Sequence, residues 1–394
     1  MSLLYIPHGK DLVIMINIGL LGYGVVGGGV GRIADKRDDM CIKKILVLPK
    51  EVDLDSRTVT DVNEIINDNT IDTVVEVMGG IHPAFEFASA ALKAGKNVVT
   101  ANKALVSAYY NELLALAEEN GVVFRCTAAV GGGIPWLVNL QRCRRVDTIK
   151  AVWGIMNGTT NYIMNAMTSA DVDFADILKQ AQELGYAEAD PTADIDGWDI
   201  RRKLCISAGV AFDQVPAEED VPMFGIRSVT AGDIKNFRTM GKVCKLVAFS
   251  EKTADGISCY LEPSLFGTDK LEAAVPANFN IISYDAEYAG VQSYYGQGAG
   301  RFPTAYNVVS DLVDILEGET EFYTGSSSPA KVDNDMVCHS YYIRTICPDA
   351  FVEDIAAECH DGWYVTKPVS VKAMHEWAAQ QKEKDPAMFL AGIR

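Results

Sequence analysis

The chain has 394 residues, enough for two or three domains with a buried core. Its hydrophobic content of 48% and charged content of 22% are ordinary for a globular protein. The formal net charge of −18 argues against non-specific binding to nucleic acid or to an anionic membrane surface, because both need a basic surface. These quantities favour chemistry on small molecules.

The cysteines and histidines indicate neither a disulfide framework nor a zinc site. Nine cysteines, an odd number, occur without any CxxC pair, so we expect reduced thiols and a cytoplasmic location. The five histidines are scattered without metal-ligand spacing. No apolar run approaches the ~18–20 residues of a membrane span. Residues 1–14 lack the features of a signal peptide, and we interpret them as a poorly ordered extension or an over-long gene start.

A glycine-rich turn follows the first predicted strand. Residues 16–21 are β-branched and apolar, which suits a buried parallel strand, and a helix-compatible stretch reaches about Asp35. Between them lies GYGVVG, in which glycines permit a tight turn and a close approach of the backbone to a pyrophosphate. The helix N-terminus would face the phosphates. We therefore predict a dinucleotide site at Gly22, Gly24, Val25, Val26 and Gly27.

The next predicted strand, residues 43–48, bears on which nicotinamide cofactor binds. NAD-specific sites usually carry an acidic residue at the tip of this strand, about 20 residues past the glycines. Here Lys50 stands near the tip and Arg57 follows, and a basic side chain at this place can meet a 2′-phosphate. This favours NADP(H). Glu51 is next to Lys50, so the alternative is a merely solvated lysine and binding of NAD(H).

Two further strand–helix units predict a doubly wound parallel sheet. The strands are expected at residues 73–77 and 97–100, with helices from about residues 83 and 103. The turn from Thr100 to Lys103 falls at the carboxyl edge of the sheet, where such folds bind ligands. We predict that both residues reach the cofactor or substrate; the alternative is that Lys103 is a helix-start lysine in solvent.

A second, α+β domain with a mixed sheet is expected after the first. The stretch 124–135 contains three consecutive glycines, which suggest a backbone held close to another group, with its carbonyls turned toward a cation, or else a flexible domain hinge. Residues 152–161 predict a strand, a tight turn and a helix capped by Thr159 or Thr160. Later strands are expected at residues 246–249 and 257–261.

The stretch 185–212 is the candidate for the chemistry. A predicted helix over residues 174–184 leads into a loop crowded with acidic residues, and a helical run follows. Asp199 and Lys203 are four residues apart and share a helix face. A lysine held beside a carboxylate at a pocket mouth can donate a proton. The alternative is an exposed ion pair worth about 0.3–0.5 kcal/mol.

Several segments together resemble homoserine dehydrogenase. They are GLLGYGVVGGGV, VVTANKAL, GGGIPW, GIMNGTTNYI, LGYAEADPTADIDGWDIRRKL and YYGQGAGRFPTAYNVVSDLVDI. They follow the family's order over about residues 15–317. NGTTNYI and GYAEADPTADIDG are highly specific to the family, whereas the glycine motif alone is not.

The resemblance implies NAD(P)H-dependent interconversion of L-aspartate 4-semialdehyde and L-homoserine, a step toward threonine, methionine and isoleucine. Lys203 is similar to the family's proton-donating lysine, and Asp199 to the acidic residue that orients this lysine and the substrate. The positions implied to contact ligands are Glu188 and Asp194 for substrate, Lys103 for substrate and cofactor, and Gly300 for cofactor.

The resemblance also implies a monovalent cation, Na⁺ or K⁺, bound by main-chain carbonyls. The matching positions are Thr127, Val130, Gly132 and Ile134. The first is commonly glutamate in the family, but a backbone ligand need not be lost with Thr127. The family further implies a homodimer or higher homo-oligomer formed through the second domain. The acidic net charge and the lack of a membrane span predict no nucleic-acid or membrane partner.

The chain departs from the family pattern at its end, where many members carry a regulatory ACT domain. Here the expected order is a strand at 340–344, a helix at 349–358, a strand at 363–365 and a helix at 371–384. This order is vaguely ACT-like, but it is short and lacks the usual effector-loop sequence.

Four regions follow from these expectations. They are an N-terminal extension (1–14), a Rossmann-type dinucleotide-binding domain (15–148, completed by a helix at 303–318), a catalytic and dimerisation domain (149–302) and a C-terminal α/β extension (319–394). In the expected reaction Lys203 protonates the developing alkoxide, Lys103 adds positive charge, and acidic side chains hold the substrate ammonium. The alternatives are a reductase for another amino-acid semialdehyde, a non-catalytic nucleotide sensor and a purely structural protein.

Overall fold

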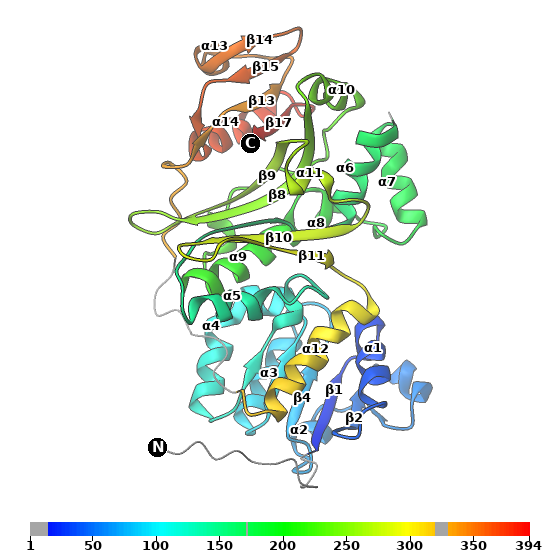
Figure 1. Cartoon of the computed structure of the whole chain (residues 1–394). Helices are drawn as coiled ribbons and strands as arrows, with labels where there is room; N and C mark the ends of the chain where they lie inside the picture. Colours follow the sequence, from blue (N-terminus) through cyan, green and yellow to red (C-terminus); the bar gives the residue numbers. More distant parts are fainter. Residues whose placement is uncertain (1–14, 171, 320–329) are drawn as a thin grey trace.

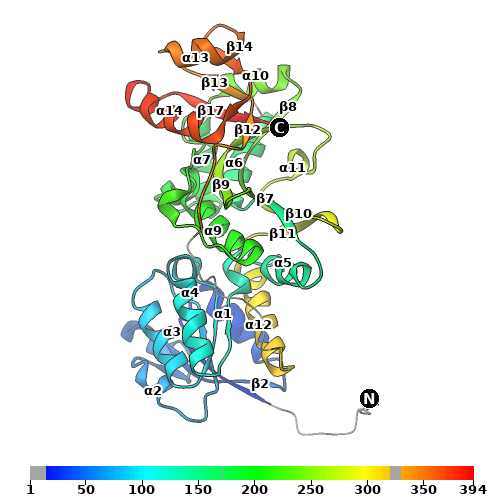
Figure 2. The same ribbon diagram turned by 90° about the vertical axis from the view of Figure 1, so that its left-hand side faces the viewer.

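The computed structural model describes residues 15–170, 172–319 and 330–394. The predicted N-terminal extension at 1–14, and residues 320–329 of the predicted C-terminal extension, lie outside these residues. Two views show a lower part built on one sheet and an upper part built on another, with helices α4 (Lys103–Glu119), α5 (Trp136–Arg144) and α9 (Trp198–Phe212) between them (Figures 1 and 2). Among the described residues no helix combines the length and apolarity that a membrane crossing requires.

The lower part is a six-stranded parallel sheet in the order β3-β2-β1-β4-β5-β6. The strands are β1 Ile16–Leu21, β2 Met40–Leu46, β3 Thr58–Val59, β4 Thr73–Glu76, β5 Asn97–Thr100 and β6 Phe124–Arg125. The order reverses on either side of β1, which makes the carboxyl ends of β1 and β4 the switch point where doubly wound sheets bind ligands. The predicted Rossmann-type sheet is confirmed.

Helices cover both faces of this sheet because successive strand residues point to opposite sides. Leu20 packs with α1 (Val25–Ala34) and α12 (Arg301–Leu316), whereas Leu21 packs with α3 (Ala84–Lys93) and α4. Gly29 lets α1 and α12 approach closely, since a Cβ there would lie 2.9 Å from the Cβ of Ala305. The helix that follows the second domain in sequence therefore packs on the first domain in space. The remaining short elements are α2 Asn63–Ile66 and the 3₁₀ helices η1 Pro49–Leu54 and η2 Thr127–Ala129.

Strand β2 ends earlier than predicted. It spans Met40–Leu46 rather than residues 43–48, and η1 begins at Pro49. Proline fixes φ and lacks an amide hydrogen, so it starts the tight turn rather than extending a strand. Leu48 is 57% exposed and outside the strand. Lys50 therefore lies in a 3₁₀ helix beyond the strand tip.

The upper part is a nine-stranded mixed sheet in the order β11-β10-β7-β8-β9-β17-β13-β15-β14. Its catalytic-domain strands are β7 Ile149–Ile155, β8 Lys242–Lys252, β9 Ile257–Gly267, β10 Phe279–Ala286 and β11 Gly290–Gln297. The flanking helices are α6 Gly158–Ala170, α7 Phe174–Glu183, α8 Thr192–Ile195, α10 Ala231–Thr239, α11 Leu271–Ala274 and the 3₁₀ helix η3 Glu218–Asp220. The predicted mixed sheet is confirmed, although β8 and β9 are longer than predicted and β10 and β11 were not predicted.

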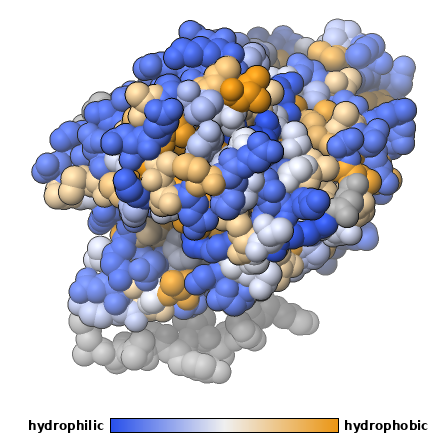
Figure 3. Space-filling model, turned by 90° about the horizontal axis from the view of Figure 1, so that it is seen from above, coloured by the Kyte–Doolittle hydropathy of each residue, from blue (hydrophilic) through white to orange (hydrophobic). Residues whose placement is uncertain are grey.

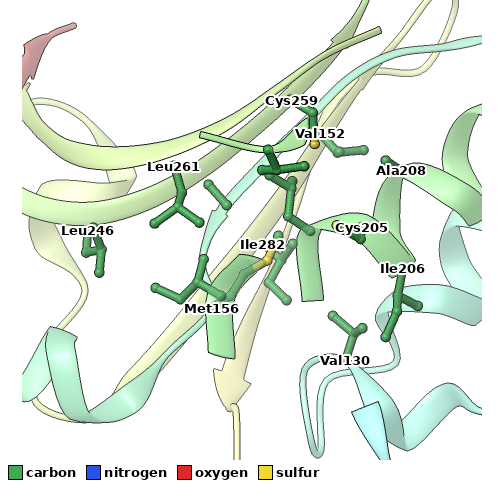
Figure 4. Close-up of a cluster of buried hydrophobic side chains, with 14 of the residues drawn as sticks. Val130, Val152, Met156, Cys205, Ile206, Ala208, Leu246, Cys259, Leu261 and Ile282 are labelled. Carbon is green, nitrogen blue, oxygen red and sulfur yellow. The ribbon is translucent and has the colours of Figure 1, made fainter. Parts of the chain in front are cut away.

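Helix α9 forms the core of the upper part. Figure 4 shows Cys205 and Ala208 of this helix near Val152 of β7 and Cys259 of β9. The apolar side chains on this helix are buried, among them Leu204, Ile206, Val210 and Phe212. Because packing fixes α9 along its length, the polar side chains at its first turns are held in place as well.

The C-terminal residues form a β-α-β-β-α-β unit, the ferredoxin-like arrangement. Its elements are β13 Tyr341–Arg344, α13 Ala350–Ile355, β14 Ala356–Cys359, β15 Trp363–Thr366, α14 Val371–Lys384 and β17 Phe389–Ile393, with β12 Cys338–His339 and β16 Val369–Ser370 pairing beside them. The helix expected at 349–358 ends at Ile355, because the chain turns there into β14. The ACT-like assignment stays a prediction, and this topology supports it.

This unit continues the catalytic sheet instead of standing apart from it. Strand β17 pairs in parallel with β9, and the joint contains Glu262, a fully buried carboxylate of β9. Burial alone would raise the pKa of Glu262, but hydrogen bonds from His339 (2.8 Å) and His375 (3.0 Å), with Arg394 at 2.9 Å, hold it below its usual range. Seen from above, this end of the molecule is mostly hydrophilic with scattered apolar groups (Figure 3).

Candidate active site

The candidate site forms where α4 of the lower part meets α9 of the upper part. Lys203 Nζ lies 2.7 Å from Asp199 Oδ2 and also donates to the Met156 carbonyl at 2.7 Å. Lys103 Nζ, from the first turn of α4, lies 2.9 Å from Asp199 Oδ1. Asp199 and Lys203 are 6% and 7% exposed, so the alternative of an exposed surface ion pair is wrong. One buried carboxylate thus holds two lysines from two different domains.

The electrostatics of this triad follow from burial and charge. Burial lowers the pKa of Lys203, while Asp199 opposes that shift. Burial would raise the pKa of Asp199, but Lys203 and then Lys103 hold it below its usual value. Lys103 is partly exposed and has a raised pKa, chiefly because of Asp199. Asp199 therefore stays ionised, and Lys203 gives up its proton more readily than a lysine in water.

A second carboxylate, Asp194, lies beside the triad. Its Oδ1 accepts a hydrogen bond from Asn157 Nδ2 at 2.7 Å, and the same amide nitrogen donates to Asp199 Oδ2 at 2.9 Å. Burial raises the pKa of Asp194. Asp194 is in the short helix α8 of the acidic loop, which the left-handed turn at Gly197 joins to α9. The loop and the catalytic helix thus present two carboxylates together.

Sequence reasoning missed Asn157 and misplaced the cap of α6. The helix begins at Gly158, and Asn157 Oδ1 accepts from the Thr160 amide at 2.9 Å. The predicted caps are wrong: Thr160 lies inside the helix, and Thr159 donates its hydroxyl to the Tyr186 carbonyl. Asparagine directly before a helix is among the preferred caps, which is the signal that could have found it.

Glu188 is not brought into this cluster. Its side chain is exposed on the loop after α7, and it makes no hydrogen bond or ion pair with any residue that the structure describes. Its carbonyl accepts a hydrogen bond from Gln182 Nε2 at 3.0 Å. The role implied for Glu188 in substrate binding therefore stays a prediction.

The glycine motif fits a dinucleotide. A Cβ at Gly27 would lie 2.1 Å from the Gly22 carbonyl oxygen, so the turn closes only with glycine there. A Cβ at Gly24 would meet no heavy atom within 4 Å, which leaves this backbone open to a ligand. Gly24 precedes α1, whose first amides, including those of Val25 and Val26, have no partner within the helix.

The carboxyl edge of the sheet carries a buried polar network beside this turn. The Thr100 hydroxyl donates to Glu76 Oε2 at 2.5 Å, and Asn102 Nδ2 donates to the Gly80 carbonyl at 2.7 Å. Asn102 Oδ1 accepts from the Leu105 amide and so caps α4 directly before Lys103. Burial raises the pKa of Glu76. Thr100 therefore faces Glu76, and its predicted cofactor contact is untested.

The two basic residues proposed for a 2′-phosphate differ in their surroundings. Lys50 is exposed in η1, and no ion pair engages it among the described residues. The Arg57 guanidinium donates to Asp55 at 2.9 Å and to Asp35 at 2.7 Å. Both basic residues stay predicted contacts, but Arg57 would have to leave two carboxylates to meet a phosphate.

The three-glycine loop, residues 131–133, packs against the GQGAG loop, residues 296–300. Gly132 has φ +56°, and a Cβ there would lie 2.5 Å from the Gly298 carbonyl oxygen. The Gly132 and Ile134 carbonyls converge, but both already accept from Asn307 Nδ2, at 2.6 and 3.0 Å. Gly300 directly precedes α12, which starts two residues earlier than predicted.

The remaining predicted cation ligands are Thr127 and Val130, both buried. Thr127 donates its amide and hydroxyl to Asp311, whose pKa burial raises to about 7. Within the described residues no group of three or more His, Cys, Asp or Glu side chains could hold a metal ion, so any cation here would rest on backbone carbonyls. These residues fit a monovalent cation only in part, because the Asn307 amide already donates to two of the four predicted carbonyl ligands, those of Gly132 and Ile134.

Comparison with known proteins decides the family. A model described as homoserine dehydrogenase matches residues 135–313, and one described as homoserine dehydrogenase, NAD binding domain, matches residues 22–126. The Bacillus subtilis homoserine dehydrogenase is 39% identical over 326 residues, which cover 79% of this chain and 75% of that protein. The chain belongs to the homoserine dehydrogenase family.

Solved structures of homoserine dehydrogenases share the fold. The Thiobacillus denitrificans structure gives a TM-score of 0.86 at 30% identity and covers 96% of this chain and 98% of its own. A hyperthermophilic archaeal homoserine dehydrogenase in complex with NADPH gives 0.66 at 25% identity, with 77% and 98% covered. The prediction of a homoserine dehydrogenase, an NAD(P)-dependent oxidoreductase, is confirmed, which disfavours the sensor and structural-protein alternatives.

Proposed function

We propose that the chain interconverts L-homoserine and L-aspartate 4-semialdehyde with a nicotinamide cofactor, and that Lys203 donates the proton in the reduction. One observation carries the assignment of roles. The buried Asp199 carboxylate holds Lys203 of the catalytic helix and Lys103 of the nucleotide sheet's edge within 2.9 Å. The edge of the sheet proposed to bind the cofactor and the helix proposed to carry the proton donor are therefore joined by the Asp199 carboxylate.

The proton is held at Lys203 Nζ. Two of the three donor directions of this ammonium are used by Asp199 and the Met156 carbonyl, which leaves one for the substrate oxygen. When bound, the nicotinamide cofactor gives or takes the hydride. Lys203 protonates the oxygen in reduction and accepts the proton in oxidation, while Lys103 stabilises the negative charge that develops there.

The substrate ammonium group is assigned to the acidic loop. Asp194 is half-buried and next to the triad, and Glu188 is exposed on the same loop. A carboxylate that is partly withdrawn from water binds a cation more strongly than a fully solvated one. Asp194 is therefore the main ammonium contact, and Glu188 of the same loop is the second proposed contact.

We expect the cofactor to be NADP(H) rather than NAD(H). The archaeal relative solved with NADPH supports this, and so does the exposed Lys50. The absorbance of reduced nicotinamide should rise faster with L-homoserine and NADP⁺ than with NAD⁺. Lys50→Glu should lower kcat/KM for NADP⁺ about tenfold and spare NAD⁺, whereas Lys93→Glu on α3 should change neither. Faster reduction of NAD⁺ by the wild type would reverse the preference, and no reduction of either would refute the function.

A monovalent cation at Thr127, Val130, Gly132 and Ile134 is a separate part of the proposal. Convergent carbonyls support it, whereas their shared donor, Asn307, weakens it. The same assay in Na⁺, K⁺ or tetramethylammonium distinguishes the two cases, since a bound cation raises the rate only with the small ions. Equal rates in all three remove the cation.

Dimerisation through the second domain is proposed from strand β11. It is an edge strand of the nine-stranded sheet, and Val291 and Tyr295 on it are 57% and 54% exposed. An open apolar edge invites pairing with another chain. Sedimentation should show a dimer, and Tyr295→Lys should weaken it about tenfold or more. Leu54→Lys serves as the control, because Leu54 is similarly exposed (60%) but lies in η1 of the lower part. A monomeric wild type contradicts the proposal.

We also propose a cytoplasmic location. All nine cysteines are free thiols, as expected where glutathione and thioredoxin keep thiols reduced. Cell fractionation tests this, and recovery with secreted proteins would contradict it.

A further inference from the structure

We propose that Asn157 is a positioning residue that keeps Asp194 aimed and ionised for the substrate ammonium group, by sharing its amide hydrogens between two carboxylates. This inference rests on the proposed function and deepens it. Asn157 is 4% exposed, and its Nδ2 lies 2.7 Å from Asp194 Oδ1 and 2.9 Å from Asp199 Oδ2. One NH₂ group thus lies between Asp194, the proposed contact for the substrate ammonium, and Asp199, the carboxylate that holds the two lysines.

The start of helix α6 fixes the orientation of this amide. Asn157 Oδ1 accepts the Thr160 amide hydrogen at 2.9 Å and caps the helix. Because the oxygen is used by the helix, the NH₂ group must face the carboxylates, and a flipped amide would lose the cap and set an oxygen against two anions. The cap therefore determines which end of the side chain meets Asp194.

The same turn also places the proton donor. The residue before Asn157 is Met156, whose carbonyl accepts from Lys203 Nζ at 2.7 Å. The junction between β7 and α6 thus contacts Lys203 through its backbone and both aspartates through a side chain. A single turn sets the distance between the site of proton transfer and the site of ammonium binding.

The charged groups around Asp194 show why its hydrogen bond from the Asn157 amide is important for keeping Asp194 ionised. Asp199 and Lys203 act on Asp194 from α9, and Lys103 faces it from α4. The hydrogen bond from Asn157 is the largest influence that opposes the effect of burial on the pKa of Asp194, ahead of the positive charge of Lys203. Without the NH₂ group, Asp194 would face Asp199 across a gap with no donor, and its carboxyl group would take up a proton at higher pH.

Two substitutions separate this role from the cap. Serine caps helices about as well as asparagine but has no NH₂ group. Asn157→Ser should raise the KM for homoserine and lower kcat/KM about 10- to 100-fold. The acidic limb of the pH profile of kcat/KM should move up by about one pH unit. Asn157→Asp keeps the cap, adds a third carboxylate and should shift the limb further. NADP⁺ binding, followed by fluorescence, should not change.

The control is Asn165→Ser, the same exchange on the same helix at a position that the proposal does not use. An Asn157→Ser protein that folds with the wild-type KM and pH profile overturns the inference. So does one that fails to fold, because the side chain would then be structural. A wild type that does not oxidise homoserine refutes the proposed function instead, so the two failures are distinguishable.

Discussion

Replacing Lys203 by methionine should lower the kcat of homoserine oxidation by about 10²–10⁴-fold, the range that general acid–base catalysis supplies. The methionine side chain fills the same buried space on α9 but can neither hold nor accept the proton now bound at Nζ. The affinity for NADP⁺ should be almost unchanged, because Lys203 contacts Asp199 and Met156 and not the glycine turn. Steady-state kinetics and cofactor titration measure the two effects.

The matched control is Lys245→Met. Lys245 is also buried, with its Nζ bonded to Asn161 Oδ1 at 2.9 Å and to the Val275 carbonyl at 2.8 Å, and burial lowers its pKa to about 8. Its loss should change stability but leave turnover intact, so a fall specific to Lys203→Met reflects chemistry. Unchanged turnover in a folded Lys203→Met protein would remove Lys203 from the mechanism.

Replacing Asp199 by asparagine should have the second largest effect. The substitution keeps the shape but leaves two neighbouring ammonium groups without their shared carboxylate. The charge of Asp199 raises the pKa of Lys203, whereas the charge of Lys103 lowers it. Loss of the Asp199 charge therefore lowers the pKa of Lys203 further. Reduction of aspartate semialdehyde needs protonated Lys203. We therefore expect kcat to fall about a hundredfold at neutral pH and the basic limb of its pH profile to move to lower pH.

Asp233→Asn provides the control for losing a buried carboxylate. Asp233 is fully buried and paired with Arg344 at 2.8 Å, at the joint with the C-terminal unit. Its exchange should lower the melting temperature without moving the pH profile. If the basic limb of Asp199→Asn coincides with that of the wild type, Asp199 does not set the protonation of Lys203.

Local patterns allowed much of this architecture to be predicted. The periodicity and the turn residues gave both ends of β1, β5 and α14 correctly. They also gave the first residue of α4. The i, i+4 spacing on α9 predicted the contact between Asp199 and Lys203 correctly, because helix geometry alone brings such residues together.

Contacts between distant segments could not be predicted in this way. Lys103 reaches Asp199 only because the two packed domains bring these residues together, and Arg57 meets Asp35 only through the packing of the first domain. The contacts of the Asn157 amide with Asp194 and Asp199 could not be predicted for the same reason, since they form only when α8 and α9 lie beside it. Strands β14 and β17 were missed because short runs carry little periodicity and owe their conformation to their partners.

The parallel pairing of β17 with β9 also covers part of a sheet edge on which another chain could otherwise assemble. A sheet that ended at β9 would offer eleven residues of unpaired backbone, the kind of template on which chains assemble edge to edge. Other segments pair with the backbone along that edge. Val332 pairs with Ile257, the Asn334 side chain with Cys259, and Pro222 and Phe224 with Leu261. Strand β17 pairs with Ser264 and Leu265. The new edge, β14, is only four residues long and exposes Glu358. Residues 222–224 and 332–334 together with β17 thus cover the long edge of β9, and the sheet ends instead at a short charged strand.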